Sequence, residues 1–96
     1  MAIRVIYEMT AQTDQGDAFT AVLADLATTI RGLPGCEGVD VLRRQDNPDQ
    51  FLFMEKWPSG EVYDEAAKMV PKTAFAPLKP LLGGPPARSV HELLES

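Results

Sequence analysis

Four side chains in the C-terminal half of the chain have the chemistry to bind a small molecule or move a proton. Trp57 is the only tryptophan, and Tyr63 follows it by six residues, so each offers one hydrogen-bond donor on a large apolar ring. Glu55 lies two residues before Trp57, and burial would raise the pKa of its carboxyl group toward that of a useful base. His91 is the only histidine, the residue type whose unperturbed pKa lies near neutrality. Such a set could hold a substrate oxygen and accept its proton.

Each of these residues also has a purely structural interpretation. Trp57 could be a core aromatic whose indole N–H binds a carbonyl, and Tyr63 a half-buried helix residue whose hydroxyl reaches water. For Glu55 we favour an ion pair with Arg43 or Arg44 on the neighbouring strand of a hairpin. A lone histidine on a strand is more often a surface or interface residue than a base.

The composition restricts the class of protein and its partners. The 96 residues form one domain, and the net charge of −5, from 14 acidic and 9 basic side chains, argues against a nucleic-acid groove. No apolar run approaches the roughly 18 residues of a membrane span. A single cysteine, Cys36, cannot form an internal disulfide, and with one histidine it argues against a zinc site. Because no signal-peptide pattern opens the chain, we expect a cytoplasmic protein.

Hydrophobic periodicity predicts strands and helices in the order β-α-β-β-α-β. Strands are expected at residues 2–9, 38–45, 51–57 and 88–94, and helices at 15–32 and after Ser59, where Pro77 and Pro80 should fragment the second helical region. Thr13 or Asp14 is expected to cap the first helix and Ser59 the second. This order is the ferredoxin-like α+β arrangement, an antiparallel four-stranded sheet with helices on one face.

The third predicted strand is apolar on both faces. Phe51, Phe53 and Trp57 share one face, and Leu52 and Met54 share the other. A sheet with one solvated face should alternate cleanly between apolar and polar residues. Since the chain has helices for only one face, we expect a second copy to cover the other, giving an isologous homodimer.

Four short motifs, in this order, resemble the antibiotic biosynthesis monooxygenase family. They are Gln15-Gly16-Asp17-Ala18-Phe19, Leu33-Pro34-Gly35-Cys36, the hairpin from Val41-Leu42-Arg43-Arg44 through Asp46-Asn47-Pro48-Asp49-Gln50-Phe51, and Met54-Glu55-Lys56-Trp57. The resemblance covers nearly the whole chain, so residues 1–96 are interpreted as one domain of this type. It implies a dimeric α+β barrel.

The resemblance also implies a reaction, the oxidation of a phenolic or quinol-type aromatic by O₂ without metal, flavin or haem. The substrate phenol loses a proton, the anion passes an electron to O₂, the radicals recombine, and the peroxide loses water. Such a cofactor-independent monooxygenase needs a dry aromatic pocket, a proton acceptor and donors for the developing oxyanion.

By the same resemblance, Trp57 and Tyr63 are the expected catalytic residues, which orient substrate oxygens. The residues expected to bind the substrate as pocket walls are Tyr7, Phe53, Met54, Met69 and Phe75. The resemblance assigns no general base.

Two other functions stay open. A non-catalytic small-molecule-binding or accessory domain would keep the pocket and the dimer but turn nothing over. Haem-degrading relatives imply a histidine on the second helix, and the position nine residues after the tryptophan is Ala66 here. They also imply an asparagine on the first strand, whereas the only asparagine, Asn47, lies in a predicted turn. Haem binding is therefore the weaker alternative.

Overall fold

The structure, a computed structural model, describes all 96 residues and confirms the predicted order of elements. The elements are β1 (Ile3–Thr10), α1 (Gly16–Arg31), β2 (Gly38–Arg43), β3 (Gln50–Trp57), α2 (Gly60–Ala67), the 3₁₀ helix η1 (Lys72–Leu81) and β4 (Ala87–Glu92). Predicted boundaries agree to within two residues at each strand end. None of the helices combines the length and apolar character needed to span a bilayer.

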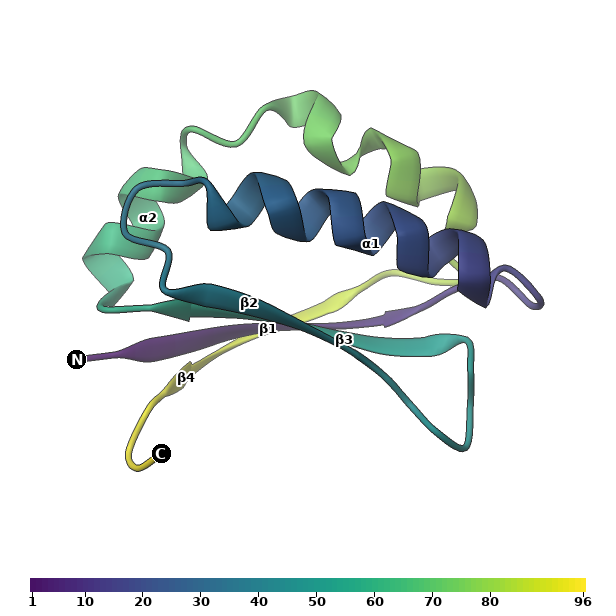
Figure 1. The fold of residues 1–96 in the computed structure, drawn as a ribbon, viewed down its shortest axis with the longest axis horizontal. Helices are drawn as coiled ribbons and strands as arrows, with labels where there is room; N and C mark the ends of the chain where they lie inside the picture. Colours follow the sequence, from purple (N-terminus) through teal and green to yellow (C-terminus); the bar gives the residue numbers. More distant parts are fainter.

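The four strands form one antiparallel sheet in the order β2-β3-β1-β4, the ferredoxin-like α+β topology. All helices lie over one face of this sheet, and the opposite face is bare (Figure 1). The register places Tyr7 of β1 directly opposite Phe53 of β3 and Arg88 of β4. Because directly paired residues project to the same side, these three side chains share the helix-covered face.

The core lies between the sheet and α1, whose apolar stripe is the one that the periodicity predicts. The buried residues of this stripe are Phe19, Leu23, Leu26, Ala27 and Ile30. Phe19 stacks on Phe51 of β3 with ring centroids 5.0 Å apart. This contact fixes α1 against the sheet.

The two α-helices begin differently. The prediction of Thr13 or Asp14 as the α1 N-cap was wrong, because Gln15 occupies that position and makes no side-chain cap. Asp14 adopts a φ of 65° in the preceding turn, one residue too early to cap the helix. The α2 prediction is confirmed, since Ser59 Oγ accepts a hydrogen bond from the backbone N–H of Val62 at 3.2 Å.

The segment η1 runs beside α1 over the sheet (Figure 1). Pro77 and Pro80 lack the N–H groups that an α-helix needs, so the predicted fragmentation takes the form of a 3₁₀ helix. Its C-terminal end is tied to β1, where the N–H of Gly83 donates to the carbonyl of Thr10 at 2.7 Å. This connection holds one side of η1 above the sheet.

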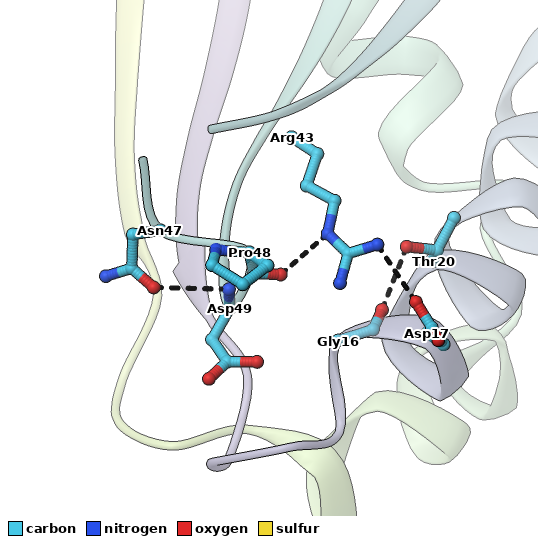
Figure 2. A network of polar contacts seen from close by, with 7 residues as sticks. All are labelled: Gly16, Asp17, Thr20, Arg43, Asn47, Pro48 and Asp49. Carbon is cyan, nitrogen blue, oxygen red and sulfur yellow. Dashed lines mark hydrogen bonds and ion pairs between the residues drawn. The ribbon is translucent and has the colours of Figure 1, made fainter. Parts of the chain in front are cut away.

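Arg43 joins the β2–β3 hairpin to the start of α1 (Figure 2). Its Nε donates to the carbonyl of Pro48 at 2.7 Å, and its Nη1 forms an ion pair with Asp17 at 3.0 Å. A Cβ at Gly16 would overlap Arg43 Nη2 and would lie 2.6 Å from the Pro48 carbonyl oxygen. The absence of a side chain at Gly16 therefore permits this close approach.

Candidate functional site

An apolar cavity of about 300 Å³ lies between the sheet and η1. This volume is at the small end of ligand sites in proteins, which run from about 300 to 1,000 Å³. Seven of its ten lining residues are hydrophobic. The lining consists of Tyr7 and Met9 of β1, Leu26 of α1, Phe53 and Glu55 of β3, Phe75, Leu78 and Lys79 of η1, and Leu82 and Pro86 beyond it.

A larger hollow of about 530 Å³ at the hairpin end of the sheet is a weaker candidate. It is more open and its wall is more polar. Two of its lining residues, Arg43 and Arg44, already pair with Asp17 and Asp46. The apolar cavity is therefore the candidate functional site.

Glu55 is the only buried charged residue of the chain, with 4% of its surface exposed. Its Oε1 accepts a hydrogen bond from the indole Nε1 of Trp57 at 2.9 Å, whereas no protein donor contacts its Oε2. Every side-chain polar atom that is fully buried has a partner, so Oε2, which has none, retains some exposed surface. Glu55 is one of the residues that line the cavity. A carboxylate residue thus lies in the wall of a mostly apolar cavity.

Burial raises the pKa of Glu55, while the Trp57 hydrogen bond and the positive charge of Arg88 act in the opposite direction. The predicted ion pair of Glu55 with Arg43 or Arg44 was wrong. Val39 is the β2 residue opposite Glu55, and Arg43 lies opposite Phe51, farther along the hairpin. The arginines are therefore too far along the strands to reach this carboxylate.

Trp57 and Tyr63 lie together behind the cavity wall. Trp57 is 1% exposed and Tyr63 is 9% exposed, and their ring centroids are 5.6 Å apart. Neither residue lines the cavity. Because the only N–H donor of the indole is bound to Glu55, Trp57 has none left for a ligand.

Arg88 links Tyr63 to the cavity residue Tyr7. Its Nε and Nη2 donate to the Tyr63 hydroxyl oxygen at 3.1 and 2.9 Å, which leaves the hydroxyl proton of Tyr63 free to be donated. Burial, and secondarily the hydrogen-bonded Tyr63 hydroxyl, raise the pKa of Tyr7 above the ordinary tyrosine value. Tyr7 therefore keeps its proton at neutral pH.

Sequence comparison gives the family directly. The sequence model of a family described as antibiotic biosynthesis monooxygenase matches residues 2–73. The chain belongs to the antibiotic biosynthesis monooxygenase family. No protein of curated function matches it.

Solved structures agree with this family assignment. Rv0793 from Mycobacterium tuberculosis is 24% identical with a TM-score of 0.83, covering 100% of this chain and 98% of its own. SnoaB from Streptomyces nogalater, a cofactor-independent oxygenase, is 15% identical with a TM-score of 0.84, covering 99% and 95%. A conserved protein from Methanosarcina mazei is 19% identical with a TM-score of 0.83, covering 96% and 92%. At these identities the likeness shows a shared fold.

In this family member, three of the five residues expected as pocket walls line the cavity. They are Tyr7, Phe53 and Phe75, with the rings of Tyr7 and Phe53 in an edge-on contact at 6.3 Å. Met54 lies instead on the bare face of the sheet, because it neighbours Phe53 on a strand whose side chains alternate. Met69 follows the end of α2 and is 57% exposed, outside the cavity.

The sequence interpretation missed Arg88 and the η1 residue Lys79. A signal for Arg88 was present, since alternation along the last strand places it on the same face as Val90. No comparable signal marks Lys79, because the 3₁₀ helix has no α-helical period from which to assign its faces.

Proposed function

We propose that this protein is a cofactor-independent monooxygenase that oxidises a small phenolic or quinol-type aromatic with O₂. The single observation that supports this best is the apolar cavity whose wall carries the carboxylate of Glu55 beside Tyr7. Membership of the antibiotic biosynthesis monooxygenase family supports a monooxygenase-type role. That SnoaB, with the same fold, is a cofactor-independent oxygenase supports it further.

The proposed reaction needs only a base, a water-poor site and O₂. The phenolic O–H loses its proton, and the phenolate passes one electron to O₂ to give an aryloxyl radical and superoxide. These combine at the ring carbon para to the oxygen, and protonation gives a hydroperoxide. Loss of water then leaves a quinone, so one atom of O₂ enters the product and the other leaves as water. An apolar wall suits this sequence because it excludes water from the reactive intermediates.

The hydroxyl groups beside the cavity serve the oxygen atom of the substrate. Tyr7 keeps its proton, and we expect its hydroxyl to turn from Tyr63 to the substrate oxygen, where its hydrogen bond stabilises the developing negative charge. Tyr63 acts through Tyr7, since its hydroxyl lies beside that of Tyr7 and accepts hydrogen bonds from Arg88. Phe53 and Phe75 supply apolar walls for the ring.

The cavity size supports a small substrate. A water molecule in the liquid occupies about 30 Å³. A cavity of about 300 Å³ therefore holds roughly ten non-hydrogen atoms. A phenol of one or two rings has this size.

O₂ uptake by metal-stripped protein with a series of hydroquinones, naphthols and anthrones tests the proposal. The expected result is uptake above the autoxidation background. With naphthols and anthrones the quinone should carry one labelled oxygen atom when the O₂ carries an oxygen isotope. A hydroquinone, whose para carbon already bears oxygen, should give an unlabelled quinone and hydrogen peroxide. Folded protein that binds these aromatics without consuming O₂ would support the non-catalytic binding domain instead.

Ala66 is buried at the helix position where haem-degrading relatives imply a histidine, and it offers no axial ligand. A haem titration should therefore give no Soret shift.

We also propose that the protein is a homodimer formed through the bare face of the sheet (Figure 1). Leu42 and Leu52 on this face are 45% and 38% exposed, and the half-buried Ile6 lies on the same face of β1. Arg4 and Glu8 flank Ile6 on that face, so a two-fold related copy can present an opposite charge to each. A second copy would remove this apolar surface from water.

A further inference from the structure

We propose that Glu55 is the general base that takes the phenolic proton, and that Trp57 is the positioning residue that holds Glu55 in place. This inference rests on the proposed function, because it names the base of that reaction. It assigns to Trp57 a role different from direct contact with the substrate.

The surroundings of Glu55 are not those of a stabilising ion pair. No cation contacts the carboxylate directly, and a single indole N–H holds one of its two oxygens. A buried carboxylate with so few partners is costly, and an apolar side chain at this position would pack at lower cost. The remaining oxygen, Oε2, has no protein donor and retains exposed surface, and Glu55 lines the cavity. This is the arrangement of a group poised to accept a proton from a ligand.

Elimination leads to the same residue. Among the cavity residues only Tyr7, Glu55 and Lys79 carry titratable groups. Tyr7 keeps its proton and is therefore not a base. Lys79 is exposed, and a lysine ammonium group has only donors, so it cannot accept a proton. His91 lies on the bare face, where its Nε2 is 2.8 Å from Ser89 Oγ. Only Glu55 can accept a proton inside the cavity near neutral pH.

The electrostatic environment suits this role. Burial raises the pKa of Glu55 and makes it a stronger base than an exposed carboxylate, while Trp57 and Arg88 favour its ionised form. A higher base pKa narrows the gap to a phenol, whose pKa resembles the value of about 10 for tyrosine. The titratable groups around Glu55 are Tyr7 of β1, Cys36 before β2, Tyr63 of α2, Lys79 of η1 and Arg88 of β4.

The first test compares pH profiles of kcat/KM for wild type, Glu55→Gln and the control Glu95→Gln. The wild-type rate should rise with pH as Glu55 loses its proton and then level off. The glutamine amide retains an oxygen that can accept the Trp57 hydrogen bond, so the Glu55→Gln protein should fold, while its kcat/KM should fall by about 100-fold or more and lose its acidic limb. Because Glu95 lies in the exposed C-terminal tail, Glu95→Gln should leave kcat/KM and its acidic limb unchanged. A Glu55→Gln protein with the wild-type rate and profile would overturn the proposal.

Trp57→Phe tests the positioning role. Because the Trp57 hydrogen bond lowers the pKa of Glu55, its removal should move the acidic limb of kcat/KM to higher pH. A merely structural role would lower the melting temperature without moving that limb. An unmoved limb in a folded Trp57→Phe protein would therefore remove Trp57 from the proposal.

A binding measurement separates this inference from the proposed function. The probe is 4-nitrophenol, whose phenolate absorbs visible light and whose neutral form does not. If Glu55 faces the ligand, its negative charge should favour the neutral phenol, so the pKa of bound 4-nitrophenol should be higher in wild type than in Glu55→Gln. Activity absent with this difference present would sink the proposed function alone. Equal pKa values in wild type and Glu55→Gln would sink the placement of Glu55 alone. No binding to wild type would sink the cavity as an aromatic site, and with it the proposed function and this inference.

Discussion

The indole nitrogen of Trp57 donates a hydrogen bond to the carboxylate of Glu55, two residues earlier on β3. Residues two apart on a strand share a face, so the pair is held by local geometry and needs no long-range contact to form. The tilted ring of Tyr63 then covers Trp57 from α2. The Glu-x-Trp motif therefore fixes a carboxylate at the cavity wall.

Glu55→Gln should raise stability near neutral pH. The pKa of Glu55 is higher in the folded protein than in the unfolded chain, so the folded state holds this proton more tightly. Its contribution to stability is fully present below the unfolded pKa and is lost as pH rises through the folded pKa. Urea denaturation across this pH range should show that the free energy of unfolding of Glu55→Gln increases relative to that of wild type as pH rises. If the free energy of unfolding of wild type increases with pH relative to that of Glu55→Gln, the folded protein stabilises the ionised carboxylate.

Gly16→Ala should destabilise the protein. The new Cβ would overlap Arg43 Nη2 and the Pro48 carbonyl in the contact of Figure 2, and the backbone carbonyl has little freedom to move. Overpacking of this kind costs about 1–3 kcal/mol. In a domain of this size each 1 kcal/mol lowers the melting temperature by about 4–8 °C. Gly60→Ala is the matched control, because nothing lies within 4 Å of a Cβ there, and its melting temperature should not fall.

Much of the fold and part of the site could be predicted from hydrophobic periodicity. Alternation along β1 and β3 places Tyr7 and Phe53 on the covered face, and they meet in the cavity. The same alternation places Met54, the neighbour of Phe53, on the other face of the sheet, so the pattern itself argues against Met54 as a pocket wall. Met69 was misplaced because α2 ends at Ala67, before the residue in question.

The partner of Glu55 required information that local patterns do not hold. Which β2 residue faces Glu55 depends on the hairpin register, and the structure sets Val39 there instead of an arginine. The contact between Arg88 and Tyr63 joins residues 25 apart in the chain. Its formation depends on β4 returning to the edge of the sheet beside β1, which periodicity predicts only as an order of elements.

Phe75→Ala should widen the range of substrates. Phe75 lines the cavity from η1 and is 38% exposed, so its removal enlarges the cavity near the surface. We expect kcat/KM for a one-ring phenol to fall about tenfold through lost apolar contact, and the preference for small over three-ring substrates to shrink. Met69→Ala removes an exposed apolar side chain outside the cavity. It should change neither kcat/KM for a one-ring phenol nor the preference for small substrates. Equal effects of the two substitutions would show that Phe75 is not a substrate wall.

Leu52→Glu should give a monomer. It places a second negative charge beside Glu8, the register partner of Leu52 on the bare face, where a second copy would have to bury it. Light scattering at micromolar concentration should give twice the 10.5 kDa chain mass for wild type and a single chain mass for Leu52→Glu. Leu94→Glu is the control, because Leu94 is 86% exposed in the C-terminal tail. A monomeric wild type would leave the apolar face without the proposed partner.

Comparison of Tyr7→Phe with Tyr63→Phe distinguishes a hydroxyl that contacts the substrate from one that acts only through its neighbour. Tyr7 lines the cavity, and loss of a donor to a developing oxyanion costs about 100-fold or more in kcat. Tyr63 lies behind the wall, so its loss should act only by weakening Tyr7, with a decrease of about tenfold or less. Arg88 is exposed, so it can rehydrate when the Tyr63 hydroxyl is removed, and both variants should keep melting temperatures near that of wild type. If Tyr63→Phe lowers kcat more than Tyr7→Phe does, the Tyr63 hydroxyl contacts the substrate itself, and the cavity must extend past Tyr7 toward Trp57 when a ligand is bound.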